Sequence, residues 1–102
     1  MNMQALLKQA QKMQKELNKA ESELKEHSYS STMAGGLVKV TVKGTMEVTQ
    51  IEIQEELLKA DEKETLQELL VSAINDAMKQ ASDEKDQVMK KMTGGVKLPG
   101  GF

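Results

Sequence analysis

The spacing of apolar residues changes along the chain, and its first section has the period of a helix. Apolar side chains in residues 3–24 recur at alternating steps of three and four, as on the seam of an amphipathic helix. Neither Gly nor Pro interrupts this stretch, and good helix formers dominate it. The pattern predicts an N-terminal helix within residues 1–27. Its seam consists of Met3, Leu6, Ala10, Met13, Leu17, Ala20 and Leu24.

The middle of the chain alternates with a period of two, which is typical of strands. Residues 37–43 place three valines on one face of a strand and more polar residues on the other. Residues 29–33 are also β-permissive, and Gly35-Gly36 separates them from the valines as a turn does. A further strand is expected over residues 46–53. The pattern therefore predicts a three-stranded antiparallel meander within residues 28–53.

Two irregularities are expected in this meander. Gly44 interrupts the alternation and is predicted to adopt the positive φ of a tight hairpin. The apolar residues of the last strand change phase partway along it, which predicts a bulge near Thr49-Gln50.

Helical periodicity returns after a connection over residues 54–60 that holds a possible helical turn. Asp61, followed three residues later by Glu64, is a variant of the capping box and predicts the start of a helix. The predicted helix covers residues 61–93, Gly94-Gly95 is expected to end it, and residues 94–102 are expected to form a flexible Gly/Pro tail. Its apolar face consists of Leu66, Leu69, Leu70, Ala73, Ile74, Ala77, Met78 and Ala81.

These elements predict a single α+β domain whose helices are longer than its sheet. The first helix spans about 32 Å and the second up to about 45 Å, whereas a seven-residue strand covers about 23 Å. Both helices must overhang the sheet, and an overhanging apolar seam predicts a partner. The simplest partner is a second copy, sharing the sheet edge or the seam about a two-fold axis. The candidate interface residues are Leu37, Val38, Val40, Val42, Val48 and Ile51.

Charge is distributed unevenly over the 102 residues, although the net charge is only −2. Both ends are basic and the middle is acidic, and all fourteen cationic residues are Lys. Four lysines follow the side of the first helix opposite its seam, where they form either a solvated face or an edge that contacts phosphates. Without Arg, little base recognition is expected. The candidate DNA-binding residues are Lys8, Lys12, Lys15, Lys19, Lys90, Lys91 and Lys97.

Other chemistry has weaker support in the sequence. The eight Met residues could form an adaptable protein-binding surface, but several lie on faces already assigned to the core. Glu23 and His27 alone do not make a metal site, so no metal or cofactor is expected. With one His, no Cys and no phosphate-binding glycine loop, neither an enzyme nor a small-molecule substrate is expected. No membrane segment is apparent, and a cytoplasmic location is expected.

The order and spacing of several motifs resemble those of the YbaB/EbfC family of bacterial nucleoid-associated proteins. The matching features are the Met- and Gln-rich first helix, AGGLVKV at residues 34–40, Gly44, and the two isoleucines that close the sheet. The Leu-Pro-Gly ending at residues 98–100 is similar too. Ala34 stands where many relatives carry a further glycine. The run in the second helix consists of Asp61, Leu66, Leu69, Leu70, Ala73, Asn75 and Ala77.

The resemblance implies a homodimer with a small central sheet and helices that project like tweezers. It also implies a cytoplasmic, nucleoid-associated protein that binds DNA with little sequence preference and alters its conformation, with roles in nucleoid organisation, gene regulation and DNA protection. It carries over no catalytic residue and no DNA-contact motif, so the lysine assignments rest on spacing and charge. The alternative function is a dimeric module that grips a partner protein through its Met-rich seam.

Overall fold

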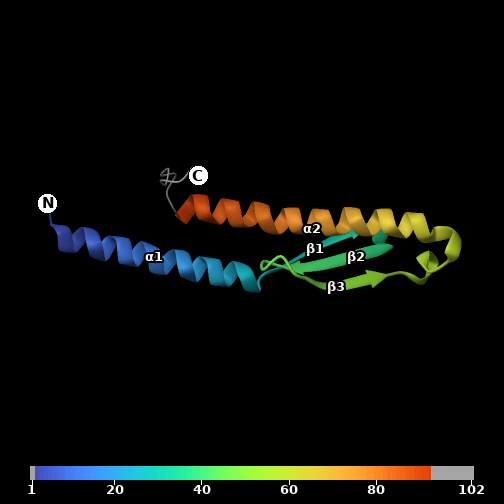
Figure 1. The fold of residues 1–102 in the computed structure, drawn as a ribbon, viewed down its shortest axis with the longest axis horizontal. Coiled ribbons are helices and arrows are strands. Elements are labelled where there is room, and N and C mark those ends of the chain that lie inside the picture. Colours follow the sequence, from blue (N-terminus) through green and yellow to red (C-terminus); the bar gives the residue numbers. More distant parts are fainter. Residues whose placement is uncertain (1, 93–102) are drawn as a thin grey trace.

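The computed structural model of the protein describes residues 2–92 and shows an elongated α+β fold (Figure 1). Its extents are 71 × 23 × 18 Å. The radius of gyration is 19.7 Å, compared with about 13 Å for a compact domain of this length. The predicted class, two long helices and a three-stranded antiparallel sheet, is confirmed. The elements are α1 (Met3–Glu26), β1 (Ser28–Met33), β2 (Val38–Lys43), β3 (Val48–Ile53) and α2 (Lys63–Met92), with short 3₁₀ turns at Ala34–Gly36, Glu55–Leu57 and Ala60–Glu62.

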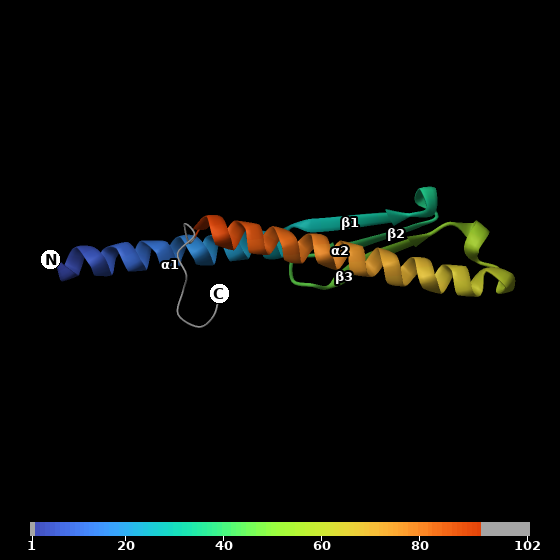
Figure 2. The ribbon, with the colours of Figure 1, turned by 90° about the horizontal axis from the view of Figure 1, so that it is seen from above.

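Helix α1 is a continuous rod that projects from the end of the sheet. Asn2 caps its first turn, since the side-chain oxygen accepts hydrogen bonds from the backbone N–H groups of Gln4 and Ala5 at 3.1 and 3.3 Å. The helix ends at Glu26 because His27 adopts an extended conformation that leads into β1. Figures 1 and 2 show that only the part of α1 nearest the sheet lies beside α2. The N-terminal part of α1 is therefore a free arm.

The core lies between one face of the sheet and α2. The strand order is β1-β2-β3, and α2 crosses β1 and β2. Val38, Val40 and Val42 of the central strand are fully buried, as their alternation predicted. Opposite them, α2 presents Ala73, Ala77 and Ala81. These small side chains at four-residue intervals let the helix axis approach the sheet closely, and larger, partly buried residues pack at their sides.

The sheet carries the predicted bulge, but Gly44 does not have the predicted conformation. Thr41 pairs with Gln50 and Val42 pairs with Val48, so Thr49 is the extra residue on β3. The positive φ in the turn between β2 and β3 belongs to Met46, at 69°, and not to Gly44. Gly44 is required for another reason, because it lies directly against the end of α1.

The turn between β1 and β2 is left-handed over three consecutive residues. Ala34, Gly35 and Gly36 have φ values of 54°, 68° and 102°. Glycine adopts this region without strain, whereas an alanine Cβ clashes with the following carbonyl oxygen. Ala34 therefore holds the conformation that a glycine would adopt more easily at this position.

Helix α2 starts differently from the prediction and is tied to β1 by side chains. Asp61 lies inside the 3₁₀ turn, and the α-helix begins at Lys63, so the expected capping box does not form its start. The Gln80 Nε2 donates to the Ser30 carbonyl and to Asp76 Oδ2, both at 3.0 Å. Hydrogen bonds from Ser31 and Gln80 lower the pKa of Asp76. The expected helix end at Gly94-Gly95 and the tail after it lie outside the described residues.

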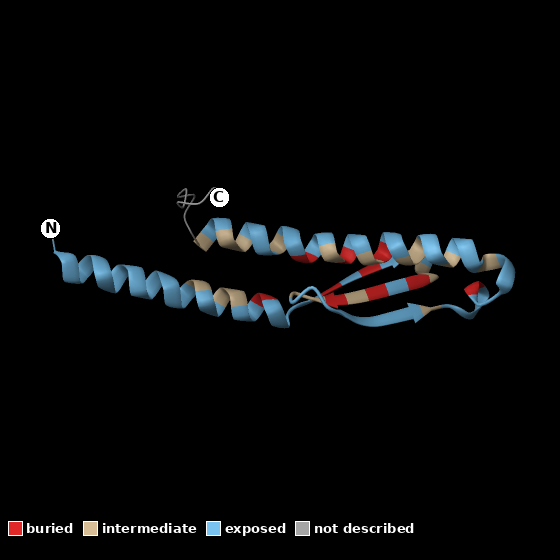
Figure 3. Ribbon diagram, in the orientation of Figure 1, coloured by how far each residue is buried: buried red, intermediate tan, exposed pale blue. Residues whose placement is uncertain are grey.

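Among the exposed apolar residues of the described part of the chain, two groups lie on β3 and on α1, both largely exposed in Figure 3. On β3, Val48 and Ile51 are 41% and 45% exposed, because α2 does not reach this edge of the sheet. On α1, the half of the seam farthest from the sheet is exposed, and a further leucine lies beside it. The exposed large apolar residues of α1 are Met3, Leu6, Leu7 and Met13.

Candidate nucleic-acid interface

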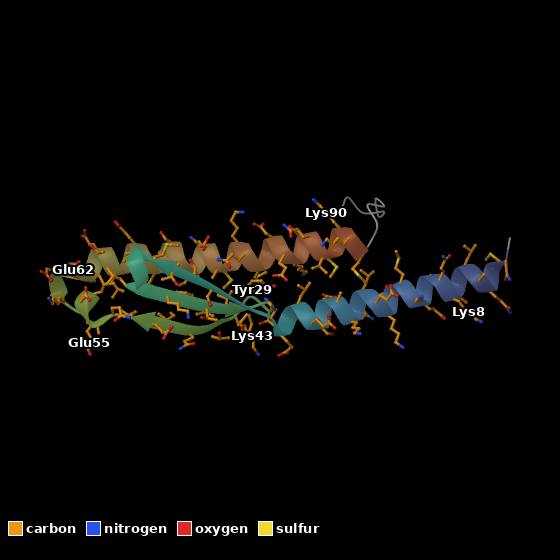
Figure 4. The ribbon with its side chains drawn as sticks, turned by 180° about the vertical axis from the view of Figure 1, so that it is seen from behind. Lys8, Tyr29, Lys43, Glu55, Glu62 and Lys90 are labelled. Carbon is orange, nitrogen blue, oxygen red and sulfur yellow. The ribbon has the colours of Figure 1, made fainter. Side chains whose placement is uncertain are left out.

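The four lysines predicted on the first helix form one exposed edge along α1, called here the lysine edge (Lys8, Lys12, Lys15 and Lys19). At 3.6 residues per turn, its centre lies about 150° around the helix from the centre of the apolar seam. The seam faces the rest of the molecule where Leu24 is buried. The lysine edge therefore faces away from α2, and Figure 4 shows Lys8 on that outer side.

In the described part of the chain, ion pairs do not neutralise the charge of the lysine edge, although they do so for some lysines of the sheet and α2. No ion pair within residues 2–92 involves any of the four. By contrast, Lys79 Nζ lies 2.8 Å from Asp83 Oδ2, and this hydrogen bond raises the pKa of Lys79. Two further pairs join Lys39 to Glu52 at 3.9 Å and Lys43 to Glu26 at 3.6 Å. Three lysines of the sheet and α2 are thus paired with acids, whereas the four of the lysine edge are not paired with any described residue.

Two of the predicted lysines near the other terminus, Lys90 and Lys91, do not join this edge in a single chain. Lys90 lies in the last turn of α2 and points away from α1 in Figure 4, opposite to Lys8. Lys91 borders an open groove of about 460 Å³ along α2, together with the carboxylates of Asp83 and Glu84. These acids make the groove unfavourable for phosphate. Lys97 lies outside the described residues.

Tyr29 lines the same groove, and its hydroxyl has a raised pKa. The side chain is only 7% exposed, and burial, followed by the neighbouring Glu84, raises the pKa of its hydroxyl to about 12. The His27 ring contacts the Tyr29 ring edge-on, with 4.9 Å between the ring centroids. Within residues 2–92 no three His, Cys, Asp or Glu residues come together in a group that could hold a metal ion. None of the helices there is long and apolar enough to cross a membrane.

The residues predicted for a dimer interface separate into two groups. Val38, Val40 and Val42 fill the core of the single chain, and Leu37 packs at its margin. A second chain cannot contact the three valines without opening the protomer. Val48 and Ile51 on β3 remain accessible.

One contact of α1 could not be found in the sequence, namely that of Gly44 with the C-terminal end of the helix. Residue spacing reveals a glycine in a turn, but the contact arises only once the hairpin folds back onto the helix. No local signal could have identified it.

Comparisons with known proteins agree with this architecture. A sequence profile of the YbaB/EbfC DNA-binding family matches residues 1–96. The chain is 43% identical over 99 residues to "Nucleoid-associated protein CA_C0126" of Clostridium acetobutylicum, covering 97% of this chain and 88% of that protein. It is 41% identical over 102 residues to "Nucleoid-associated protein NT01CX_0824" of Clostridium novyi, covering 100% and 90%.

A solved structure has the same fold. The crystal structure of uncharacterized protein HP0035 from Helicobacter pylori superposes with a TM-score of 0.77 at 29% identity, covering 91% of this chain and 98% of that one. The resemblance seen in the sequence is thus confirmed over nearly the whole length. The chain belongs to the YbaB/EbfC DNA-binding family.

Proposed function

We propose that the protein is a nucleoid-associated protein that binds duplex DNA through the phosphates, using the lysine edge of α1. The observation that carries this proposal is the row of four exposed lysines without ion pairs on a rigid, projecting helix. Family membership and the names of the relatives support DNA as the partner. The function proposed is binding and not catalysis, in the cytoplasm and on the nucleoid.

The dimensions of the lysine edge suit a phosphate backbone. Lys8 and Lys19 are eleven residues apart, which is about 16 Å along the helix axis. One DNA strand carries a phosphate about every 3.4 Å of helix axis, so four lysines can each approach a different phosphate. Lys contacts phosphate as a point charge, and the chain has no Arg for bidentate contacts with guanine. Binding with little sequence preference follows.

The active form we propose is a homodimer joined at the uncovered edge of the sheet. Val48 and Ile51 on β3 lie on the same face as the core valines but beyond the reach of α2. A second copy that covers them about a two-fold axis would remove apolar surface from water, at about 25 cal/mol per Å². Two arms would then project from one body, and two lysine edges on a single duplex would alter its conformation. Roles in nucleoid organisation, gene regulation and DNA protection fit such an activity.

A second candidate is a protein-interaction module, which the exposed seam of the arm favours. Met3, Leu6, Leu7 and Met13 are 77%, 47%, 60% and 40% exposed, and a helix from a partner protein could cover them. This partner would bind the seam, opposite the lysine edge.

Binding to unrelated duplexes separates the two candidates. Fluorescence anisotropy of several labelled duplexes of different sequence, at low salt, is expected to give similar Kd values for all of them. A parallel series with Leu6→Gln and Met13→Gln, which alter only the seam, is expected to leave these values unchanged. Absence of binding to every duplex would contradict the proposal, and loss of binding in the seam variants would move the DNA contacts to the apolar side of the arm.

A further inference from the structure

Gly44 lies where the turn after β2 meets the last turns of α1. A Cβ built on Gly44 would overlap the carbonyl oxygen of Leu24 and would lie 3.1 Å from the Cα of Lys25. Both neighbours are backbone atoms, so no change of side-chain rotamer could relieve the overlap. Gly44 does not have a positive φ, and its own backbone therefore does not require glycine. The requirement comes from the close approach of the helix.

The same place holds a hydrogen bond and an ion pair that link the end of α1 to the sheet. The Gly44 backbone N–H donates to the carbonyl oxygen of His27 at 2.9 Å, just after α1 ends. Lys43 Nζ lies 3.6 Å from Glu26 Oε2. Leu24, the buried residue of α1, packs here around a cavity of only about 30 Å³. We call this cluster of Leu24, Glu26, His27, Lys43 and Gly44 the arm joint.

A small displacement at the arm joint becomes a large one at the far end of α1. Restoring van der Waals separation between a new Cβ and the Leu24 carbonyl needs a shift of about 1.5 Å. Spread over the last two turns of α1, about 10 Å, this shift tilts the helix by about 9°. The helix is about 36 Å long, so its N-terminal end would move by about 5 Å. Such a displacement exceeds the spacing of phosphates along the duplex axis, about 3.4 Å.

We infer that Gly44 is a positioning residue for the arm: its lack of a side chain sets the direction in which α1 leaves the sheet, and so where the lysine edge meets DNA. The effect on DNA rests on the function proposed above, whereas the effect on helix direction does not. Gly44 itself contacts no ligand in this scheme. It acts through the backbone of Leu24.

The inference is tested with Gly44→Ala and a matched control, Gly36→Ala. Gly36 has a φ of 102° with open space around it, so an alanine there strains the backbone at the opposite end of the sheet without touching α1. Residual dipolar couplings of the backbone N–H groups in α1, β1 and β2 report the direction of the helix relative to the sheet. Measured without DNA on isotope-labelled protein in a weakly aligned solution, they give the angle between α1 and the sheet.

Gly44→Ala is expected to change this angle by about 9° and Gly36→Ala to leave it unchanged. The salt dependence of duplex binding is expected to weaken by at least about one phosphate contact in Gly44→Ala alone. A merely destabilised protein would lose affinity equally at every salt concentration and keep its slope.

Each other outcome overturns the inference. An unchanged angle in Gly44→Ala would show that the joint absorbs the extra Cβ, and an equal change in Gly36→Ala would show a general loss of structure. Loss of the helical circular-dichroism signal in Gly44→Ala would also contradict it, because a tilted arm leaves the core of Val38, Val40 and Val42 intact. The angle is measured without DNA, so it tests the joint even where the wild-type chain binds no duplex.

Discussion

Replacing the four residues of the lysine edge with Gln tests the proposed DNA contact most directly. Gln has nearly the helix propensity of Lys, and all four positions are exposed, so α1 is expected to remain folded. The substitution removes four positive charges from a chain whose net charge is −2. What it changes is the charge of one face of the arm.

The expected magnitude follows from the number of phosphates that the edge can reach. Each neutralised phosphate contributes about 0.9 to the slope of log affinity against log salt, so four contribute about 3.6. Wild-type affinity is then expected to fall on the order of a hundredfold between about 50 and 200 mM salt for one arm on the duplex. The variant is expected to lose this slope together with most of its affinity at low salt.

A salt series of anisotropy titrations on one short duplex measures both quantities. The matched control carries Gln at Lys39, Lys59, Lys63 and Lys79, which changes net charge equally but lies on the sheet, the connection and α2. Two of these lysines form exposed ion pairs whose loss costs little stability. The control is expected to keep the wild-type slope. A wild-type slope in the α1 variant, or equal losses in both variants, would refute the placement of phosphates on this edge.

Three further predictions concern the fold and the assembly. The pKa of Tyr29 is raised by burial from 10.0 to about 12, so the stability that its neutral hydroxyl contributes is complete below pH 10 and is lost as pH rises towards 12. In urea titrations Tyr29→Phe is therefore expected to lose less unfolding free energy than the wild type across this range, and an equal loss would contradict it. Ile51→Lys is expected to convert the proposed dimer into single chains in sedimentation equilibrium, whereas Thr32→Lys, on the other sheet face, leaves it intact; a dimer in both variants would move the interface elsewhere. Ala34→Gly is expected to raise the free energy of unfolding by about 0.5–1 kcal/mol. The gain from removing left-handed strain, about 1–2 kcal/mol, exceeds the cost of the greater entropy of the unfolded chain, about 0.5–1 kcal/mol. A lower urea midpoint in this variant would show that the strain estimate is wrong.

The helices and strands could be predicted from the sequence because each has a local period. The step pattern of α1 is uninterrupted, so its limits were predicted within two residues. The parity change in β3 predicted the bulge, since one extra residue must occur wherever apolar side chains change faces. The start of α2 was harder to predict, because the 3₁₀ turn that contains Asp61 depends on how the connection packs.

Only part of the candidate site could be predicted from the sequence. Helical geometry alone places the four lysines of α1 on one face, opposite the seam. Whether Lys90 belongs to that face depends on how α2 lies relative to α1, and in the single chain it points the other way. The role of Gly44 was predicted for the wrong reason, because a hairpin signal in the sequence is identical whether the glycine serves its own φ or a neighbouring helix.

By itself, the sequence determined which residues share a face: the three valines of β2, the alanines of α2 and the lysines of α1. Only the tertiary structure decided which of those faces are covered. It buried the valines under α2, left Val48 and Ile51 open, and fixed the arm against Gly44. The physical reason is that periodicity is set by backbone geometry within a few residues, whereas coverage depends on the lengths and crossing of elements far apart in the chain.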